Sequence, residues 1–457
     1  MNWIDELKNL LGDCVRTDAA TLQAHAGDKW HAAALPEAVV LATSTEEVAA
    51  AMKVAHVHGV PVTPRGAGVG YVGGCVPVRG GLVISTASMT RIIEVNPADG
   101  VAIAEAGVLT ADLQESCARE GWFYPPDPAS RKESSIGGNI ATNAGGPRCL
   151  KYGVTRAYVL GLTVVLPDGN ILSCGGRTHK NKQGFDLVGL FCGSEGMLGI
   201  ITRAILRIIP APPARAALHA SFPRFALAAQ AVQNVLQGGH LPCALEITDA
   251  FTLAAARRHL GPGVLPEAAQ GHIIIEIDGR TDAVASELEA IADILKSTGA
   301  VDIVSATTEE AVEAIWQLRR EFSYSLKATG LTKLNEDIVI PRSQLVALVE
   351  FCESMQQETG IPVACFGHSG DGNIHTNIMV LKDADGKDIR PPADALVNRL
   401  FEWVVSHGGS ITGEHGIGLA KAPWFADAIG PVAMRLHRTL KQAIDPSGIL
   451  NPGKMGL

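Results

Sequence analysis

Two histidines lie seven positions apart in the stretch "FGHSGDGNIHTNI", residues 366–378. The flanking segments "PVACFGH" and "NIHTNIMV" have the character of two strands joined by a four-residue turn, Ser369–Gly372. In that register His368 lies opposite Asn373, and because strand side chains alternate, His375 and Asn377 share its face. The histidines become diagonal neighbours about 7–8 Å apart at the backbone. Two imidazoles that tilt inward at this spacing could bind one metal ion at about 2.0–2.1 Å each.

A metal site needs a third ligand, and "GEHGIG", residues 413–418, offers the carboxylate of Glu414 between glycines. Two histidines and one carboxylate leave coordination positions open, as a catalytic metal requires. Simpler interpretations are polar packing for the histidine pair and a charge at a helix start for Glu414. The nine cysteines are scattered without a CxxC pair, so a zinc ribbon, an iron–sulfur cluster or a disulfide framework is not expected.

The stretch "PRGAGVGYVGG", residues 64–74, contains a literal GxGxxG pattern. In the dinucleotide fingerprint a helix follows this pattern. Here Gly74, Pro77 and the Gly80–Gly81 pair follow at once, so no helix of useful length is expected and the Rossmann interpretation fails. The exposed backbone N–H groups could still bind a pyrophosphate, with Arg65 adding charge. A plain glycine turn is the alternative.

Two further segments, "SSIGGNIATNAGG" at 134–146 and "GSEGMLGII" at 193–201, are also rich in glycine and small residues. Each of the three segments is followed by apolar strand. Together they favour a large nucleotide-like cofactor over three unrelated turns.

The elements that must position these residues suggest an α+β protein. "STEEVAAAMKVAHVHG" predicts a helix with Ser44 as N-cap, Glu47 completing the capping box and Gly59 at its end. The chain of 457 residues is too long for one core, and "PAPPARAA" from Pro210 is a linker signal. We therefore expect a first domain at 1–210 and a second at 211–440, where helices such as 281–298 cover an antiparallel sheet. Residues 441–457 form a Pro/Gly tail that we expect to return to the first domain.

The formal net charge of −9 and the lack of a Lys/Arg run argue against a nucleic-acid partner. No apolar stretch approaches the roughly 18 residues of a transmembrane helix. "MNWIDELKNLLG" has no signal-peptide pattern and predicts an amphipathic helix. We expect a cytoplasmic protein, with peripheral contact at the inner membrane as the alternative.

Several separated motifs resemble one family: "PRGAGVGYVGG", "DPAS", "SSIGGNIATNAGG", "KYG", "GSEGMLGIIT", "GHSGDGNIH", "GEHGIG" and "LNPGK". The chain from about residue 35 onward is similar to the D-2-hydroxyacid dehydrogenases of the vanillyl-alcohol-oxidase superfamily, which include D-lactate dehydrogenase, D-2-hydroxyglutarate dehydrogenase and the flavoprotein subunit of glycolate oxidase. The resemblance implies an FAD-binding domain of two α+β subdomains followed by an α+β substrate domain.

The resemblance also implies the residues that bind the cofactor. The first loop would wrap the FAD pyrophosphate, the second cluster would line the flavin, the third would approach the adenosine, and the tail would return to the cofactor. No histidine in the matching loop could tether the flavin, so non-covalent FAD is expected. The implied residues are Pro64, Arg65, Gly66, Ala67, Gly68, Val69, Gly70, Gly74, Asp127, Ser134, Ser135, Gly138, Asn139, Thr142, Glu195, Ile200, Ile201 and Asn451.

In metal-using members of this family, the positions of His368, His375 and Glu414 hold a divalent ion, usually zinc. The position of His415 acts as the base, and that of Asn377 contacts substrate. Without the resemblance, His415 would be read as an exposed turn histidine.

Arg319 stands where the family often has a carboxylate-binding arginine, and Ser323 lies one helical turn further on. A solvated helix face is the alternative for Arg319 and Arg320. Hydroxyglutarate enzymes carry a lysine six positions before a matching proline; counting back from Pro341 gives Asn335, and the nearest lysine is Lys333. This departure favours a small acid, D-lactate first and glycolate next, over D-2-hydroxyglutarate or D-malate.

The expected reaction is oxidation of a 2-hydroxy acid to the 2-oxo acid, by metal-assisted proton abstraction and hydride transfer to flavin N5. An external acceptor is then needed: an electron-transfer flavoprotein, a quinone, a cytochrome or an iron–sulfur subunit. A homodimer is a candidate assembly. Two rival functions are a flavin enzyme for phenolic or sugar substrates and a non-catalytic FAD-binding subunit of an electron-transfer complex.

Overall fold

The computed structural model describes residues 2–457, which divide into two compact units. Unit 1 comprises the chain through Gly146, then Gly153–Ala211 and Glu414–Leu457, and unit 2 comprises Pro147–Tyr152 and Pro212–Gly413. The change of unit at 211/212 falls within one residue of the expected boundary. Residues 414–440, which we expected in the second domain, group with unit 1, and the short segment 147–152 groups with unit 2.

Unit 1 contains a four-stranded sheet in the order β1-β2-β4-β3, in which β2 and β3 both run parallel to β4. Helix α3 begins and ends as the sequence predicts, because the Ser44 hydroxyl accepts the N–H of Glu47 at 3.2 Å and Gly59 is left-handed. The elements of this part are α1 (Trp3–Leu11), η1 (Gly12–Cys14), β1 (Val15–Arg16), α2 (Ala19–Ala24), β2 (Ala38–Leu41), α3 (Thr45–His58), β3 (Val62–Arg65) and β4 (Leu82–Ser85).

The second sheet of unit 1 has five antiparallel strands in the order β5-β6-β10-β8-β9, and β7 pairs with β11 separately. Helix α14 is kinked at Gly430. The elements are β5 (Ile92–Asn96), β6 (Val101–Glu105), α4 (Thr110–Arg119), β7 (Trp122–Phe123), α5 (Ile136–Thr142), η2 (Thr155–Tyr158), β8 (Val159–Val165), β9 (Ile171–Gly175), α7 (Leu187–Phe191), β10 (Ile200–Arg207), β11 (Ile209–Pro210) and α14 (Ala422–Ile444).

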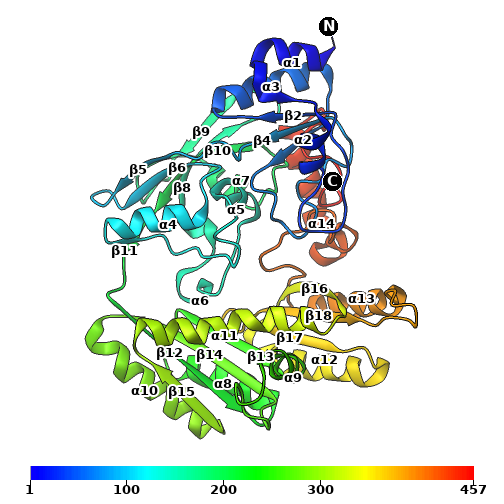
Figure 1. Cartoon of the computed structure of the whole chain (residues 1–457). Helices are drawn as coiled ribbons and strands as arrows, with labels where there is room; N and C mark the ends of the chain where they lie inside the picture. The colour runs from blue at the N-terminus through cyan, green and yellow to red at the C-terminus, as the bar shows by residue number, and fades with distance from the viewer. Residues whose placement is uncertain (1) are drawn as a thin grey trace. The chain divides into compact units, whose positions relative to one another are not determined.

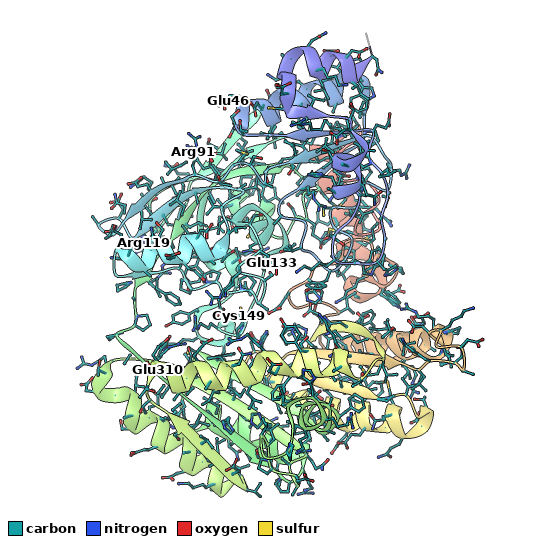
Figure 2. All side chains as sticks on the ribbon, viewed as in Figure 1. Glu46, Arg91, Arg119, Glu133, Cys149 and Glu310 are labelled. Carbon is teal, nitrogen blue, oxygen red and sulfur yellow. The ribbon has the colours of Figure 1, made fainter. Side chains whose placement is uncertain are left out.

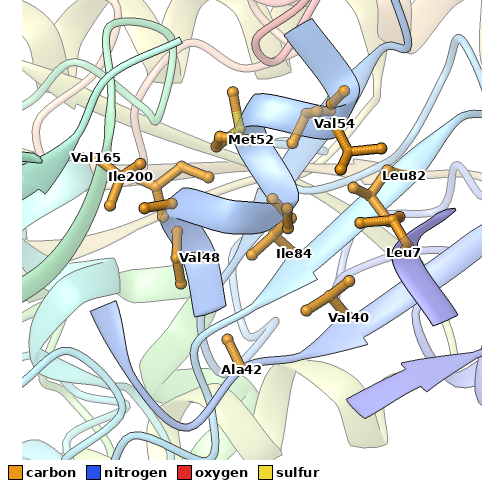
Figure 3. Close-up of a cluster of buried hydrophobic side chains, with 14 of the residues drawn as sticks. Leu7, Val40, Ala42, Val48, Met52, Val54, Leu82, Ile84, Val165 and Ile200 are labelled. Atoms are coloured by element: carbon orange, nitrogen blue, oxygen red, sulfur yellow. The ribbon is translucent and has the colours of Figure 1, made fainter. Parts of the chain in front are cut away.

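One apolar core joins the two sheets of unit 1 through α3 (Figure 3). Met52 of α3 and Ile84 of β4 are fully buried, and Val165 and Ile200 reach the same cluster from the second sheet. Charged side chains such as Glu46 on α3 and Arg119 on α4 lie on the exposed surface (Figure 2). The helix therefore buries an apolar face between the sheets and turns its polar face outward.

Unit 2 is built on a seven-stranded antiparallel sheet in the order β15-β12-β14-β13-β17-β18-β16 (Figure 1). Its elements are α6 (Cys149–Tyr152), β12 (Ala214–Phe222), α8 (Phe225–Gln237), β13 (Ala244–Asp249), α9 (Ala250–Leu260), β14 (Gly271–Gly279), α10 (Thr281–Ser297), β15 (Asp302–Ala306), α11 (Glu309–Ala328), β16 (Thr332–Val339), η3 (Arg342–Gln344), α12 (Leu345–Thr359), β17 (Val363–His368), β18 (Asn373–Val380) and α13 (Arg390–Ser406).

Helices cover both faces of this sheet. Ala217 and Ile274 pack against apolar side chains of α9 and α11. On the opposite face Gly271 lies against Ala228 of α8. Strand β14 is accordingly buried from Gly271 through Asp278. The α+β class and the helix-covered antiparallel sheet expected from the sequence are confirmed.

No helix within residues 2–457 combines the length and the apolar character needed to cross a membrane.

Candidate functional site

The predicted histidine hairpin is present in unit 2. Strands β17 and β18 pair with His368 opposite Asn373 and Phe366 opposite His375, so the predicted register is confirmed. The imidazole ring centroids of His368 and His375 are 5.7 Å apart, with their planes at 80°. Phe366 and His368 are two residues apart on β17, so both histidines share the face of Phe366, and Arg319 of α11 lies over the Phe366 ring on that face.

The structure gathers the three predicted metal ligands. His368, His375 and Glu414 each offer one ligand atom, and these atoms lie within 4.8 Å of one another. The division between the units falls at the peptide bond before Glu414, so this residue is attached directly to the last residue of unit 2. Two imidazoles and one carboxylate match the ligands of catalytic zinc, and the donor set fits a divalent ion.

A buried carboxylate that the sequence reasoning missed anchors the segment leading to Glu414. Asp337 of β16 is fully buried. One oxygen accepts the Thr412 hydroxyl and the Gly413 N–H, each at 3.0 Å, and the other accepts the Asn373 amide at 2.7 Å. Asp337 therefore ties this segment to the histidine hairpin. The sequence offered one signal for it: Asp337 directly precedes the apolar run "IVI", residues 338–340, where a charge is expected to be buried and paired.

Glu246 of β13 is a second buried carboxylate that the sequence reasoning did not single out. One oxygen accepts a hydrogen bond from Nδ1 of His368, and the other accepts Nε of Arg319 at 2.6 Å. Burial opposes ionisation of Glu246, but the electrostatic interactions and hydrogen bonds with His368 and Arg319 outweigh it and lower the pKa of the carboxyl. Glu246 thus forms hydrogen bonds to both a predicted metal ligand, His368, and a predicted substrate-binding residue, Arg319.

The predicted carboxylate-binding residues form a cationic group beside this hairpin. Nζ of Lys333 lies 3.4 Å from the Ser323 hydroxyl. The pKa of Lys333 is lowered to about 8, mainly because the side chain is buried and to a smaller extent because Lys327 and Arg319 are positively charged. The terminal nitrogens of Arg319 make no hydrogen bond to any residue in the described chain, whereas the exposed Arg320 binds Glu313. The solvated-face interpretation therefore applies to Arg320 and not to Arg319.

Two asparagines face each other across β16 and β18, where Asn335 pairs with Asn377. The Asn377 amide donates to the carbonyls of Ala364 and His375, at 3.2 and 3.1 Å. The buried side-chain oxygens of both asparagines have no partner within residues 2–457. Because buried acceptors are normally paired, these oxygens suit a ligand with a hydrogen-bond donor. Asn335 was not among the predicted site residues.

In unit 1 the three glycine segments lie side by side. A Cβ on Gly66 would meet the Ser135 hydroxyl at 2.6 Å, and a Cβ on Gly196 would meet the ring of Pro64 at 3.1 Å. Any residue other than glycine at position 66 would place its Cβ against Ser135 and push the first segment away from the second. Segments far apart in the sequence thus form one surface of backbone and small side chains.

The first glycine loop has the properties of an anion site. None of the N–H groups from Gly66 to Gly70 donates a hydrogen bond to another residue in the described part of the chain. No helix occurs within the described residues 66–81, as the sequence predicts. Unpaired N–H groups in succession, half-buried at residues 66–69 and exposed at Gly70, fit a pyrophosphate. The Arg65 guanidinium instead braces the loop, bonding the carbonyl of Gly27 at 2.5 Å and the sulfur of Cys75 at 3.2 Å.

Several other predicted cofactor residues have side chains engaged within unit 1. Asn139 donates to the Thr110 hydroxyl at 2.6 Å, Thr142 donates to the Gly138 carbonyl at 3.2 Å, and Ile200 lies in the core. The hydroxyl of Thr142 and the amide of Asn139 each use one donor in these bonds and keep acceptor capacity, whereas Ile200 has no polar side-chain atom. The other members of the predicted set lie as follows: Ser134, Ser135 and Ile201 are buried, and Asp127 lies against Gly146.

Asn451 of the tail joins two of the glycine segments. Its side-chain amide donates to the carbonyl of Gly74 at 3.0 Å and to that of Glu195 at 2.8 Å. Its side-chain oxygen is buried without a partner in the described chain. The tail thus returns to the glycine segments of unit 1, and Asn451 presents an acceptor there.

Glu195 ties the segment after Glu414 to the rest of unit 1. Its carboxylate accepts the N–H groups of Ile417 and Gly418 at 2.6 and 2.7 Å, while burial raises the pKa of this carboxyl. Gly416 has a φ of 84°, and a Cβ there would lie 2.6 Å from the carboxylate. His415 precedes this clamp, and its ring lies 5.1 Å from that of Tyr71.

Comparison with protein families gives two matches that together span most of the chain. Residues 36–175 match the FAD binding domain model, and residues 211–455 match the model of the C-terminal domain of FAD linked oxidases.

Curated relatives share about a third of their residues with this chain over nearly its full length. Glycolate oxidase subunit GlcD of Bacillus subtilis is 38% identical over 92% of this chain and 89% of its own. D-lactate dehydrogenase of Archaeoglobus fulgidus is 34% identical over 100% and 99%. D-2-hydroxyglutarate dehydrogenase of Stutzerimonas stutzeri is 34% identical over 99% and 98%.

Among solved structures, 4-ethylphenol oxidase of Gulosibacter chungangensis superposes with a TM-score of 0.80, covering 99% of this chain and 96% of its own at 20% identity. p-Cresol methylhydroxylase superposes with a TM-score of 0.78, covering 100% and 96%, also at 20% identity. A likeness at this identity concerns the fold alone.

Proposed function

Since the chain belongs to the FAD-linked oxidases and has the fold of the vanillyl-alcohol-oxidase type, we propose that it is an FAD-dependent dehydrogenase of small D-2-hydroxy acids. The substrate would be D-lactate first and glycolate next, and the product the 2-oxo acid. The observation that carries this proposal is that His368 and His375, which group with Glu414 as possible metal ligands, share the sheet of unit 2 with the cationic Lys333.

A 2-hydroxy acid carries its carboxylate and its hydroxyl on adjacent carbons. Arg319, whose terminal nitrogens have no other partner within residues 2–457, would bind the carboxylate as a planar fork. Lys333 and Ser323 would add a charge and a hydroxyl donor. Asn377 would contact the substrate oxygen at C2. These residues orient the acid and do not themselves change its oxidation state.

His415 would take the hydroxyl proton. A neutral imidazole has one ring nitrogen with a free lone pair, and this nitrogen can accept a proton from a hydroxyl placed within hydrogen-bond reach. The clamp of Glu195 on Ile417 and Gly418 would hold the segment that carries this histidine.

When bound, FAD supplies the two-electron oxidant, and a divalent ion, which we propose to be zinc, supplies Lewis acidity toward the substrate oxygens. His368, His375 and Glu414 would hold the ion. The glycine segments at 64–74, 134–146 and 193–201, with Asn451, would hold the FAD without a covalent bond. An external acceptor, such as an electron-transfer flavoprotein, a quinone, a cytochrome or an iron–sulfur subunit, would reoxidise the enzyme.

D-2-hydroxyglutarate and D-malate form a second candidate substrate class, supported by the relative that is named for hydroxyglutarate. Asn335 argues for the smaller acids, because its neutral amide offers no charge to a second carboxylate. A cytoplasmic location, peripheral contact at the inner membrane and a homodimer stay predictions from the sequence.

The test is an anaerobic titration of the purified flavoprotein with D-lactate, glycolate, D-malate and D-2-hydroxyglutarate, followed by flavin absorbance. We expect D-lactate to bleach the flavin fastest, a chelator to stop the bleaching and zinc to restore it. Bleaching by a phenol or a sugar that survives chelation would favour the first rival function. Absence of bleaching by every acid, with zinc bound, would favour the non-catalytic subunit.

A further inference from the structure

A carboxylate within a buried strand is unusual, because burying an unpaired charge is strongly unfavourable. Glu246 lies in the middle of β13, is 1% exposed and sits between the apolar residues Leu245 and Ile247. The pairing of β13 with β17, where Ile247 lies opposite Gly367, brings Glu246 beside His368. The strand order of the sheet therefore places this charge beside the histidine hairpin.

Each oxygen of Glu246 has its own partner. One accepts from Nδ1 of His368 and the other accepts from Nε of Arg319 at 2.6 Å. The Arg319 guanidinium also lies over the ring of Phe366, 4.9 Å from its centroid, and the arginine side chain is 12% exposed. A single carboxylate thus fixes the orientation of both the imidazole and the guanidinium.

The hydrogen bond to His368 has a chemical consequence. A carboxylate is an acceptor, so Nδ1 of His368 must carry the proton. Nε2 is then the ring nitrogen with the lone pair that a metal requires. On the other side, the bond at Nε leaves the terminal nitrogens of Arg319 as the fork for a ligand.

We propose that Glu246 is a positioning residue that links the metal ligand His368 to the carboxylate-binding Arg319, fixing the tautomer of the first and the direction of the second. This role rests on the proposed function, since it concerns the same metal and the same substrate. It predicts that one substitution weakens two different binding events in unit 2.

The decisive variant is Glu246→Gln, which keeps the shape of the side chain. Nε of Arg319 is always a donor, so the glutamine oxygen must face it. The glutamine NH₂ then faces Nδ1 of His368, which has to accept, and the ring proton moves to Nε2. We expect zinc affinity, measured by competition with a chromophoric chelator, to fall about 10- to 100-fold.

The second readout is the affinity for pyruvate, the proposed product, measured from the perturbation of the flavin spectrum. We expect it to weaken about tenfold or more in Glu246→Gln, because Arg319 loses the charged partner that orients it. The matched control is Glu276→Gln in the adjacent strand β14. Glu276 is also 1% exposed. It binds Arg148 and Arg215 at 3.0 and 3.3 Å and accepts the indole N–H of Trp316, and none of these partners is a proposed metal or substrate residue. Both affinities should be retained there.

Retention of either affinity in Glu246→Gln overturns the proposal, because the shared role requires both to fall. If wild-type protein binds no zinc and no acid bleaches its flavin, the proposed function itself has failed. Should the variant not fold, selective ¹⁵N labelling of histidine in chelated wild-type protein reports the tautomer of His368. A proton on Nδ1 supports the proposal, and a proton on Nε2 overturns it.

Discussion

The clamp between Glu195 and the His415 segment leads to a quantitative prediction for Glu195→Gln. In the wild type, the two carboxylate oxygens accept the N–H groups of Ile417 and Gly418 at 2.6 and 2.7 Å. Glutamine fills the same space but offers one acceptor oxygen. Its NH₂ group must face the second N–H, donor against donor.

The expected loss follows from these contacts. A hydrogen bond to a charged group contributes about 1.5–3 kcal/mol, and an unsatisfied buried N–H costs about 1–3 kcal/mol. Burial raises the pKa of Glu195, so a neutral amide recovers part of the desolvation penalty. A net local destabilisation of about 2–3 kcal/mol remains. At about 1.4 kcal/mol per factor of ten, the segment should open about 30- to 150-fold more often.

Hydrogen exchange followed by mass spectrometry of peptides covering 416–420 measures this opening directly. Exchange should be faster by that factor, and turnover should fall because His415 precedes the clamp. Glu105→Gln is the control: Glu105 is also buried in unit 1, but it binds the side chain of Arg91. Unchanged exchange at 416–420 in Glu195→Gln would refute the reasoning.

Three further predictions follow from the site and its surroundings. His415→Gln should lower turnover about 10²- to 10⁴-fold while the flavin spectrum and zinc content stay unchanged; stopped-flow reduction with D-lactate measures it, and normal turnover would exclude His415 as the base. Lys333→Met should raise KM for D-lactate about tenfold at pH 7. Because the wild-type pKa of Lys333 is about 8, wild-type KM should rise as the pH increases through 8, and a rise of equal size in the variant would contradict this role. In unit 2, His272 bonds His219 at 3.2 Å, and burial lowers the pKa of both rings. The unfolded chain, with histidine pKa values near 6.5, then binds protons more readily, so stability present at pH 7.5 should be lost as the pH falls through 6.5. Urea unfolding should show this loss in the wild type and less of it in His272→Phe; an equal loss in both would contradict the assignment.

Features that depend on neighbouring residues could be predicted from the sequence. The limits of α3 follow from Ser44, Glu47 and Gly59, because capping is decided within one turn of a helix. The register of the histidine hairpin follows from the alternation of strand side chains around a four-residue turn. The absence of a helix after the first glycine loop follows from Pro77 and the adjacent glycines.

The division of the chain around Glu414 could not be predicted in this way. The linker signal at Pro210 is local, and it marks the change of unit at 211/212 to within one residue. Residues 414–440 carry no such signal. They are tied to unit 1 by bonds to distant residues: Ile417 and Gly418 donate to Glu195, 222 and 223 positions away in the chain, and Leu419 and Ala420 donate to the carbonyl of Val72.

The sequence alone therefore determined the chemistry that is available: imidazoles, a carboxylate and unpaired glycine N–H groups, each with its local backbone. Tertiary structure alone decided which charges meet. Glu246 reaches His368 across 122 positions, and Asp337 reaches Gly413 across 76. The physical reason is that such partners are set by the order and pairing of distant strands, while local conformational preferences extend over only a few residues.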